Sequence, residues 1–313
     1  MKKILITGGT GFIGHNLVKE FVKDYKVICL IRPNTKNLDR LTEVFNHVEF
    51  IEHNIRDTLP NISDIDIVLH AGANPSAADS ISNPVEAITD NVIGTVNLLE
   101  FARQSQVKKF VYYSSGEVFG PIPIGQDSQA DDSYNPNSPY AASKSAGEDL
   151  CVAYSNSYGL PVSIIHINNT FGPMCQANRF PVIALRKILN NEPISIHVGP
   201  MGIAGGRRWF HAEDVALHTR FILDTQTKLC EKWNSAGNKF ISNVELASKI
   251  AALVNKDVII TYVPVDRPGH DLCFSIDPSK LYDKGWCEPY SLEDRLKQTI
   301  NWYEANPIWL TRE

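Results

Sequence analysis

A tyrosine and a lysine four residues apart form the pair whose types and spacing most clearly suggest chemistry. Tyr140 and Lys144 would lie on one face of a helix that begins after Ser138 and Pro139. A nearby ammonium lowers the pKa of a phenol, so the tyrosinate can accept a hydroxyl proton while a hydride leaves the same carbon for a nicotinamide. Ser115, at the end of a predicted strand, could bond the same substrate oxygen. These residues predict an oxidoreductase.

A glycine-rich motif near the amino terminus predicts the site for the dinucleotide. The motif is Thr7-Gly8-Gly9-Thr10-Gly11-Phe12-Ile13-Gly14, which follows an apolar run and opens a helical pattern. Glycines at positions 8, 11 and 14 permit a tight turn, a close approach to a pyrophosphate and close packing of helix on strand. The helix N-terminus adds hydrogen-bond donors and positive potential. We expect cofactor contacts from Gly8, Thr10, Gly11, Phe12, Ile13 and Gly14.

The end of the second predicted strand leaves the choice of cofactor open. A carboxylate that binds the ribose hydroxyls is expected there, but Arg32 takes its place. Its guanidinium could hold a 2′-phosphate and favour NADP, or stack on adenine and accept NAD. We expect NAD, with NADP as the alternative. Further candidate contacts to the cofactor are Asn54, Ile55, Ala71, Ala73 and Lys144.

The composition excludes several classes of protein. The chain has 313 residues, 43% hydrophobic and 21% charged, which is typical of a globular protein. A formal net charge of -5 gives no general attraction to nucleic acid or anionic membranes, so we expect neither as a partner. The six cysteines are dispersed, without zinc-type spacing, and we expect no metal. No apolar run is long enough for a signal peptide or membrane span, so we expect a cytoplasmic location.

The elements that must position these residues alternate between strands and helices. Strands are expected at 3–7, 27–31, 48–52, 67–70, 110–113 and 162–167, and a long amphipathic helix at 84–103. The alternation predicts an α/β fold with a doubly wound parallel (Rossmann) sheet over residues 1–170. Residues 171–313, to which helices at 244–254 and 292–306 belong, are expected to form mainly a smaller α/β substrate lobe, with some later segments returning to the sheet. Ligands would bind at the carboxyl ends of the strands.

The glycine turn, the Ser115, Tyr140 and Lys144 set and the order of elements resemble the extended short-chain dehydrogenase/reductase family. The likeness is closest to its nucleotide-sugar epimerase and dehydratase branch, in particular to dTDP-glucose 4,6-dehydratases. The segments that carry this likeness are 80–84, 91–95, 267–271 and 302–306.

The resemblance implies a role for each candidate residue. Tyr140 would be the base, Lys144 would bind the nicotinamide ribose and tune the tyrosine, and Ser115 would polarise the C4 oxygen of the sugar. Asn169 would lie near the sugar diphosphate, and Arg207 and Arg267 would neutralise the nucleotide phosphates. It also implies a homodimer through a four-helix bundle of residues 84–103 and 138–158.

The sequence departs from the dehydratases after Ser115. Those enzymes carry Thr-Asp-Glu, in which the Asp protonates the departing C6 hydroxyl and the Glu removes the C5 proton. Here Gly116 can do neither. Glu117 could act on C5, bond a sugar hydroxyl or cap backbone amides. The glycine is also expected to leave volume beside C6, enough for the side chain of a heptose.

We therefore predict oxidation of C4 of an NDP-hexose or NDP-heptose to a 4-keto sugar without elimination, as in a dehydrogenase. A 4-epimerase and a 4,6-dehydratase are the alternatives. An oxidoreductase branch that acts on steroids or flavonoids would suit Arg32 but not the two phosphate-site arginines. A catalytically silent, cofactor-sensing binding protein is the alternative of another class, and the complete Ser115, Tyr140 and Lys144 set argues against it.

Overall fold

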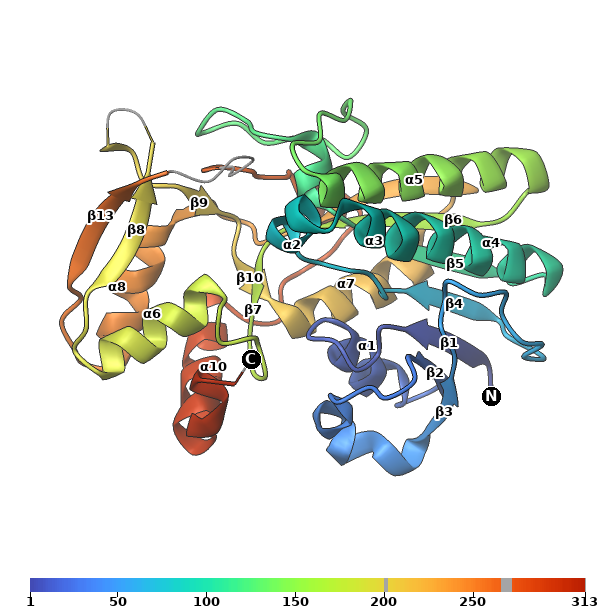
Figure 1. The fold of residues 1–313 in the computed structure, drawn as a ribbon, viewed down its shortest axis with the longest axis horizontal. Coiled ribbons are helices and arrows are strands. Elements are labelled where there is room, and N and C mark those ends of the chain that lie inside the picture. Colours follow the sequence, from blue (N-terminus) through green and yellow to red (C-terminus); the bar gives the residue numbers. More distant parts are fainter. Residues whose placement is uncertain (200–201, 266–271, 313) are drawn as a thin grey trace.

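The computed structural model describes residues 1–199, 202–265 and 272–312, which form a parallel sheet and a smaller second lobe (Figure 1). The sheet has seven strands in the order β11-β6-β5-β4-β1-β2-β3, and every pair is parallel. The strands are β1 (Lys3–Thr7), β2 (Lys26–Ile31), β3 (Val48–Glu52), β4 (Ile67–His70), β5 (Lys109–Ser115), β6 (Val162–Ile167) and β11 (Cys230–Ser235). The expected doubly wound α/β fold is confirmed.

Apolar runs that are buried on both faces explain why the inner segments of the sheet are strands. In β1 the side chains of Ile4 and Ile6 point to one face of the sheet and that of Leu5 to the other, and all three are completely buried. On the first face they meet α1 (Gly14–Phe21) and α7 (Ala212–Thr225). On the second face lie α4 (Gly94–Gln104) and α5 (Pro139–Tyr158). The sheet is therefore covered by helices on both sides.

The helical stretch before β5 is not the single α-helix that its periodicity predicts. It consists of α2 (Ala77–Ser82), α3 (Pro84–Ile88), a π-helical segment η2 (Thr89–Ile93) and α4. The wider π-turn lets two consecutive polar residues, Asp90 and Asn91, both lie buried. Asp90 accepts a hydrogen bond of 2.5 Å from Arg56, while Asn91 faces the site described below.

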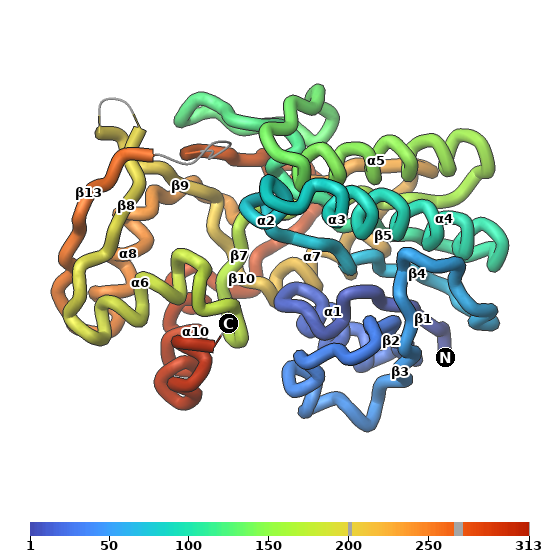
Figure 2. The backbone as a smooth tube through the Cα atoms, viewed as in Figure 1, coloured from blue at the N-terminus to red at the C-terminus, as the bar shows by residue number. Residues whose placement is uncertain are grey.

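The second lobe packs around its own hydrophobic core, beside the sheet (Figure 2). Its helices are α6 (Phe180–Leu189), α8 (Asn243–Leu253) and α10 (Leu292–Ala305). Its strands form three pairs: β8 (Ile194–Val198) with β13 (Ile260–Pro264), β9 (Gly206–Arg207) with β12 (Ile241–Ser242), and β7 (Thr170–Phe171) with β10 (Phe210–His211). Short helical segments are η1 (Leu38–His47), η3 (Gly116–Phe119), α9 (Ser279–Asp283) and η5 (Pro307–Leu310). Along the chain, α7 and β11 return to the sheet between β10 and β12.

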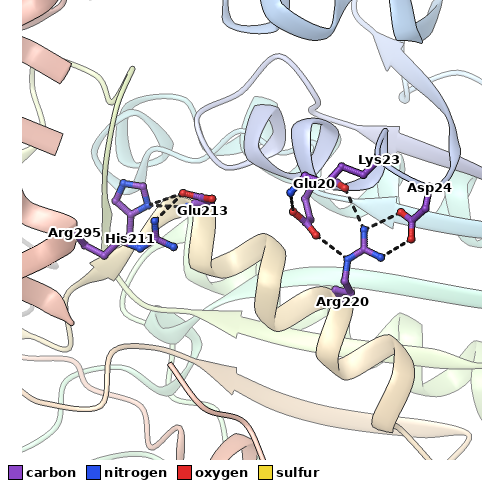
Figure 3. Close-up of polar contacts among 7 residues, drawn as sticks. All are labelled: Glu20, Lys23, Asp24, His211, Glu213, Arg220 and Arg295. Carbon is purple, nitrogen blue, oxygen red and sulfur yellow. Dashed lines mark hydrogen bonds and ion pairs between the residues drawn. The ribbon is translucent and has the colours of Figure 1, made fainter. Parts of the chain in front are cut away.

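Two arginines tie α7 to both halves of the molecule (Figure 3). Arg220 on α7 donates hydrogen bonds of 2.7 Å to Glu20 on α1 and to Asp24 just beyond it. At the other end of α7, the buried Arg295 of α10 donates a hydrogen bond of 2.7 Å to Glu213. The helix α7 therefore connects α1, which covers the same face of the sheet, to the second lobe. No helix in the described part of the chain is long and apolar enough to cross a membrane.

Candidate active site

The glycine motif forms the tight turn that a pyrophosphate site requires. Gly8 has a φ of 70°, and a Cβ atom at this position would lie 2.7 Å from the backbone nitrogen of Gly72. A Cβ atom on Gly14 would lie 1.9 Å from the carbonyl oxygen of Gly8, and Gly11 donates a backbone hydrogen bond of 2.8 Å to the same oxygen. Side chains at these positions would therefore break the turn, and the turn fits the dinucleotide predicted for it.

A buried hydrogen-bond network joins this turn to the helical layer. The hydroxyl of Thr7 accepts a hydrogen bond of 3.0 Å from the Gly72 backbone and lies 2.8 Å from Nδ1 of His70. Nε2 of His70 lies 3.0 Å from the hydroxyl of Thr95 on α4. Burial, and secondarily the charge of Lys144, hold the pKa of His70 well below its ordinary value, so the ring is neutral. The network fixes the carboxyl ends of β1 and β4.

The π-helical segment positions the start of α5. Asn91 accepts a hydrogen bond of 2.7 Å from the backbone of Asn74 and donates one of 2.8 Å to Ser143. Ser143 in turn donates to the backbone carbonyl of Tyr140 at 2.7 Å. The backbone nitrogen of Tyr140 donates to the buried Ser80 at 3.0 Å. The backbone of Tyr140 is therefore held from two sides.

Tyr140 and Ser115 meet at the carboxyl end of β5, as the sequence predicts. Their side chains lie close enough to interact, since the Ser115 hydroxyl acts to lower the pKa of the phenol, and Tyr140 is half-buried. The pKa of Tyr140 is nevertheless raised to about 12, by burial first and by the charge of Glu117 second. The Ser115 hydroxyl and the charge of Arg179 act in the opposite direction. The expectation of a lowered pKa is therefore not met in this structure, because burial and Glu117 outweigh the stabilising groups.

Lys144 lies one turn beyond Tyr140 and is almost completely buried. Its Nζ lies 4.1 Å from the ring centroid of Tyr112, and the Tyr112 hydroxyl donates a hydrogen bond of 3.2 Å to the Lys144 carbonyl. Burial lowers the pKa of Lys144 to about 8, while the charge of Glu148 acts to raise it. The ammonium form is therefore present at neutral pH.

On the substrate side, the structure brings two of the three expected residues together. Asn169, just after β6, accepts a hydrogen bond of 3.1 Å from Nε of Arg207. The same guanidinium donates to the carbonyl of Leu272 at 2.6 Å and lies 4.1 Å from the ring centroid of Phe274. The third residue, Arg267, lies outside the described residues.

The remaining cofactor candidates follow the carboxyl ends of strands β2, β3 and β4. Arg32 is exposed directly after β2. Asn54 and Ile55 follow β3, and a Cβ atom at Gly94 of α4 would meet the Ile55 side chain at 2.7 Å. Ala71 and Ala73, half-buried, follow β4. Their contacts with a cofactor stay a prediction.

Two arginines at the site were missed by sequence reasoning. The buried Arg40 on η1 donates hydrogen bonds to the carbonyl of Thr10 in the glycine turn, at 3.1 Å, and to that of Met174, at 3.2 Å. Arg179, which precedes α6, lies close enough to Tyr140 to lower its pKa. No local pattern marks either residue, since each acts on a segment far away in the sequence.

The space at the Cβ position of Gly116 is filled. A Cβ atom at this position would lie 3.2 Å from Cγ2 of Ile276 and 3.4 Å from Cδ2 of Phe274. The glycine therefore leaves no empty space at its own Cβ position, and the room expected beside C6 for a heptose side chain stays a prediction. The backbone N–H of Glu117 donates a hydrogen bond of 3.2 Å to the Ser115 hydroxyl. Ser115, and not Glu117, therefore caps the N-terminus of η3.

The fold and this site define a nicotinamide-dependent oxidoreductase of the short-chain dehydrogenase type. The model of the NAD dependent epimerase/dehydratase family matches residues 4–234, and the chain belongs to this family. The cofactor predicted from the sequence, NAD, is thereby confirmed.

Individual relatives agree with this assignment. The chain is 30% identical to a dTDP-glucose 4,6-dehydratase of Neisseria meningitidis over 344 residues, which cover 99% of this chain and 95% of the relative. The structure of DesIV, a dTDP-glucose 4,6-dehydratase of Streptomyces venezuelae with NAD bound, is 27% identical, covers 98% of each chain and has a TM-score of 0.86. The UDP-glucose 4-epimerase of Thermus thermophilus in complex with NAD is 25% identical, with coverage of 96% of this chain and 99% of that chain and a TM-score of 0.84.

Proposed function

We propose that this enzyme oxidises C4 of a nucleotide-diphosphate hexose to the 4-keto sugar and then reduces it again, so that the net reaction is 4-epimerisation. The meeting of Ser115, at the end of β5, with Tyr140 and Lys144, one turn apart on α5, is the observation that carries the oxidation step. The names of the relatives, which act on dTDP-glucose or UDP-glucose, support a nucleotide sugar as substrate.

The proposed roles follow from the protonation states of these groups. Tyr140 accepts the O4 proton as the C4–O4 bond becomes a carbonyl, and returns it on reduction. Ser115 donates a hydrogen bond to O4 and keeps the oxygen aimed at the phenol. Lys144 supplies an ammonium ion on the same helix face, while Ser115 and Arg179 oppose the effect of burial on the pKa of Tyr140. A bound NAD would supply the hydride acceptor for the oxidation of C4 and the hydride donor for the reduction.

The cofactor would be held by the glycine turn, with Lys144 on the nicotinamide ribose. The turn is closed by the backbone contact of Gly14 with Gly8, and Arg40 braces it through the carbonyl of Thr10. Asn169 and Arg207, which are hydrogen-bonded to each other, would bind the diphosphate of the sugar nucleotide.

Position 116 favours epimerisation over dehydration. Loss of water across C5 and C6 needs an acid for the departing hydroxyl. Gly116 has no side chain, and Ile276 and Phe274 fill the space where one would lie. A 4-keto sugar formed beside these apolar side chains has no acid from this position to protonate its C6 oxygen.

A 4,6-dehydratase is the second candidate. Two observations favour it: relatives with this activity are 30% identical over nearly the whole chain, and Glu117, the residue that would remove the C5 proton, lies near Tyr140. This reading requires the acid to come from elsewhere in the site.

Mass spectrometry of a panel of nucleotide sugars incubated with the NAD-loaded enzyme separates these candidates. Epimerisation leaves the mass unchanged and gives a new isomer on chromatography. Loss of the mass of water identifies a dehydratase. Accumulation of a keto sugar that has lost only two hydrogens identifies a dehydrogenase. Tyr140→Phe should abolish all three outcomes while NAD still binds; an active Tyr140→Phe enzyme would contradict the proposal.

We also propose that the enzyme works as a homodimer. Ile81, Val85 and Ile88 on α2 and α3 present exposed apolar side chains, and α3 packs beside α5. Burial of such a surface against a second copy of the chain would satisfy it. The cytoplasmic location stays a prediction from the sequence.

A further inference from the structure

A buried carboxylate lies one helical turn beyond Lys144, on the side of α5 that packs against the sheet. Glu148 has no solvent-exposed surface. Ser114, next to the catalytic candidate Ser115, donates a hydrogen bond to its Oε1, and the hydroxyl of Tyr134 donates one of 2.5 Å to its Oε2. A ring nitrogen of His166 on β6 lies 3.0 Å from the same oxygen. A carboxylate that is buried away from water requires such hydrogen-bond donors.

The surroundings of Glu148 favour its ionised form. Lys232 on β11 lies 3.9 Å from Oε2 and donates a hydrogen bond of 2.5 Å to the hydroxyl of Tyr134. Burial raises the pKa of Tyr134, so this hydroxyl keeps its own proton and donates it to Glu148. Burial alone would also raise the pKa of Glu148, but its interactions with His166, Ser114 and Tyr134 hold it below its ordinary value. The bonds from Ser114 and Tyr134 and the nearness of Lys232 favour the carboxylate whatever the charge of His166.

The hydrogen bonds of His166 require a proton on both ring nitrogens. Nδ1 lies 2.9 Å from Oδ1 of Asn234. The orientation of that amide is fixed, because its nitrogen donates to the carbonyls of Ser128, at 2.9 Å, and Asp277, at 3.1 Å. The atom that faces Nδ1 is therefore an acceptor, and so is the Glu148 oxygen that faces Nε2. With Glu148 ionised, His166 must be an imidazolium.

This pair is well placed to act on Lys144. Burial lowers the pKa of His70 and raises the pKa of Tyr112 and of Cys151. These three described neighbours of the ammonium are therefore neutral at neutral pH. Glu148 is thus the anion that opposes the burial of Lys144, and its effect on the pKa of Lys144 is upward. The positions of Lys144 and Glu148 on one helix face keep their separation constant.

We propose that Glu148 is a positioning residue: the imidazolium of His166 forms a buried ion pair with it and keeps it ionised, and the Glu148 carboxylate, one helical turn from Lys144, holds that side chain as an ammonium ion beside Tyr140. The inference deepens the proposed function, because it rests on the roles proposed for Tyr140 and Lys144. The charge state of His166 does not depend on those roles and can be tested separately.

The first experiment measures that charge state in the full-length protein. Long-range ¹H–¹⁵N spectra of protein with ¹⁵N-labelled histidine report the protonation of each ring nitrogen, and the signal that is missing in His166→Gln identifies His166. We expect both nitrogens to be protonated at neutral pH. An unprotonated ring nitrogen in the wild-type protein would overturn the ion pair, and this measurement needs no active variant.

The second experiment measures the effect on Lys144. Glu148→Gln should move the alkaline limb of NAD affinity and of kcat/KM to lower pH by about one unit or more, because the pKa of Lys144 falls without the anion. Glu148→Asp restores the charge and should bring the limb back toward the wild-type position. Glu231→Gln is the matched control. Glu231 lies next to Lys232 on β11, and its buried carboxylate pairs with Lys280, so this variant should leave the limb in place.

The outcomes distinguish this inference from the proposed function. If Glu148→Gln and Glu148→Asp both lower activity but leave the limb at the wild-type pH, Glu148 only supports the fold and the inference is wrong. If the wild-type enzyme converts no nucleotide sugar, the proposed function fails, while the spectra of His166 and the pH dependence of NAD binding still decide the role of Glu148.

Discussion

Arg40 and Thr10 are joined where the glycine turn meets the second lobe: Nη1 of the buried guanidinium donates a hydrogen bond of 3.1 Å to the Thr10 carbonyl. The other terminal nitrogen donates to the carbonyl of Met174 at 3.2 Å, and the guanidinium lies 5.5 Å from the ring centroid of Trp309. One side chain thus connects the cofactor turn to two segments of the second lobe.

Arg40→Met should therefore loosen the cofactor turn. Hydrogen bonds to charged groups contribute about 1.5–3 kcal/mol, so we expect the free energy of unfolding to fall by about 2–4 kcal/mol. NAD affinity, measured by titration calorimetry, should fall about tenfold. Arg312→Met is the control, because Arg312 stacks on the same Trp309 ring but pairs with Asp39. Equal NAD affinity for Arg40→Met and the wild type would refute the bracing role.

Glu117→Gln should change the pH dependence of the reaction. Glu117 is the second largest cause, after burial, of the raised pKa of Tyr140. Without this negative charge the phenolate is less disfavoured, so the pKa falls from about 12 and the acidic limb of kcat/KM moves to lower pH. The control Glu245→Gln on α8, at a side chain that is 43% exposed, should leave the profile unchanged. A limb that stays in place or moves to higher pH in Glu117→Gln would show that the charge does not act on Tyr140.

Gly116→Asp should destabilise the protein and should not create a dehydratase. The new side chain meets Ile276 and Phe274, and overpacking of this kind costs about 1–3 kcal/mol. Ile276→Ala removes the nearer obstacle. The double variant should therefore lose less unfolding free energy than the sum of the losses in the two single variants. Chemical denaturation gives all four stabilities. Strict additivity, or loss of water from the substrate of Gly116→Asp, would contradict this account of position 116.

Val85→Glu should prevent dimerisation. Val85 is 77% exposed on α3, so a charge there costs the monomer little but would be buried in the proposed four-helix bundle. Light scattering should give about twice the mass of one chain for the wild type and the mass of one chain for the variant. Ile308→Glu, at a residue 72% exposed in the second lobe, should remain dimeric. A monomeric wild type would refute the proposed dimer.

The fold was largely predictable because its inner strands are buried on both faces. Residues such as Ile4 and Leu5 form β-branched and aliphatic runs with no polar interruption, and the expected ends of the first six strands agree closely with the structure. The seventh strand, β11, escaped prediction. It lies at the sheet edge and contains Glu231, Lys232 and Asn234, so its sequence shows no apolar run.

The site was predictable where one short motif carries it. Tyr140 and Lys144 share a helix face, and the glycines share one turn, so spacing alone relates them. Contacts between distant segments were not accessible in this way. Arg40 reaches Met174, and Ile276 fills the space beside Gly116, because the second lobe folds back onto the sheet.

The place of β11 in the sheet has a consequence for synthesis of the protein on the ribosome. Its partner β6 is complete at Ile167, but residues 230–235 emerge only after α6, β8 and α7 have been made. Until then the outer edge of β6 has unpaired backbone groups in an isoleucine-rich strand, the kind of edge that recruits other chains. The nucleotide-binding half of the nascent chain therefore cannot finish folding before much of the second lobe has been translated, and this interval is when the growing polypeptide most needs a chaperone.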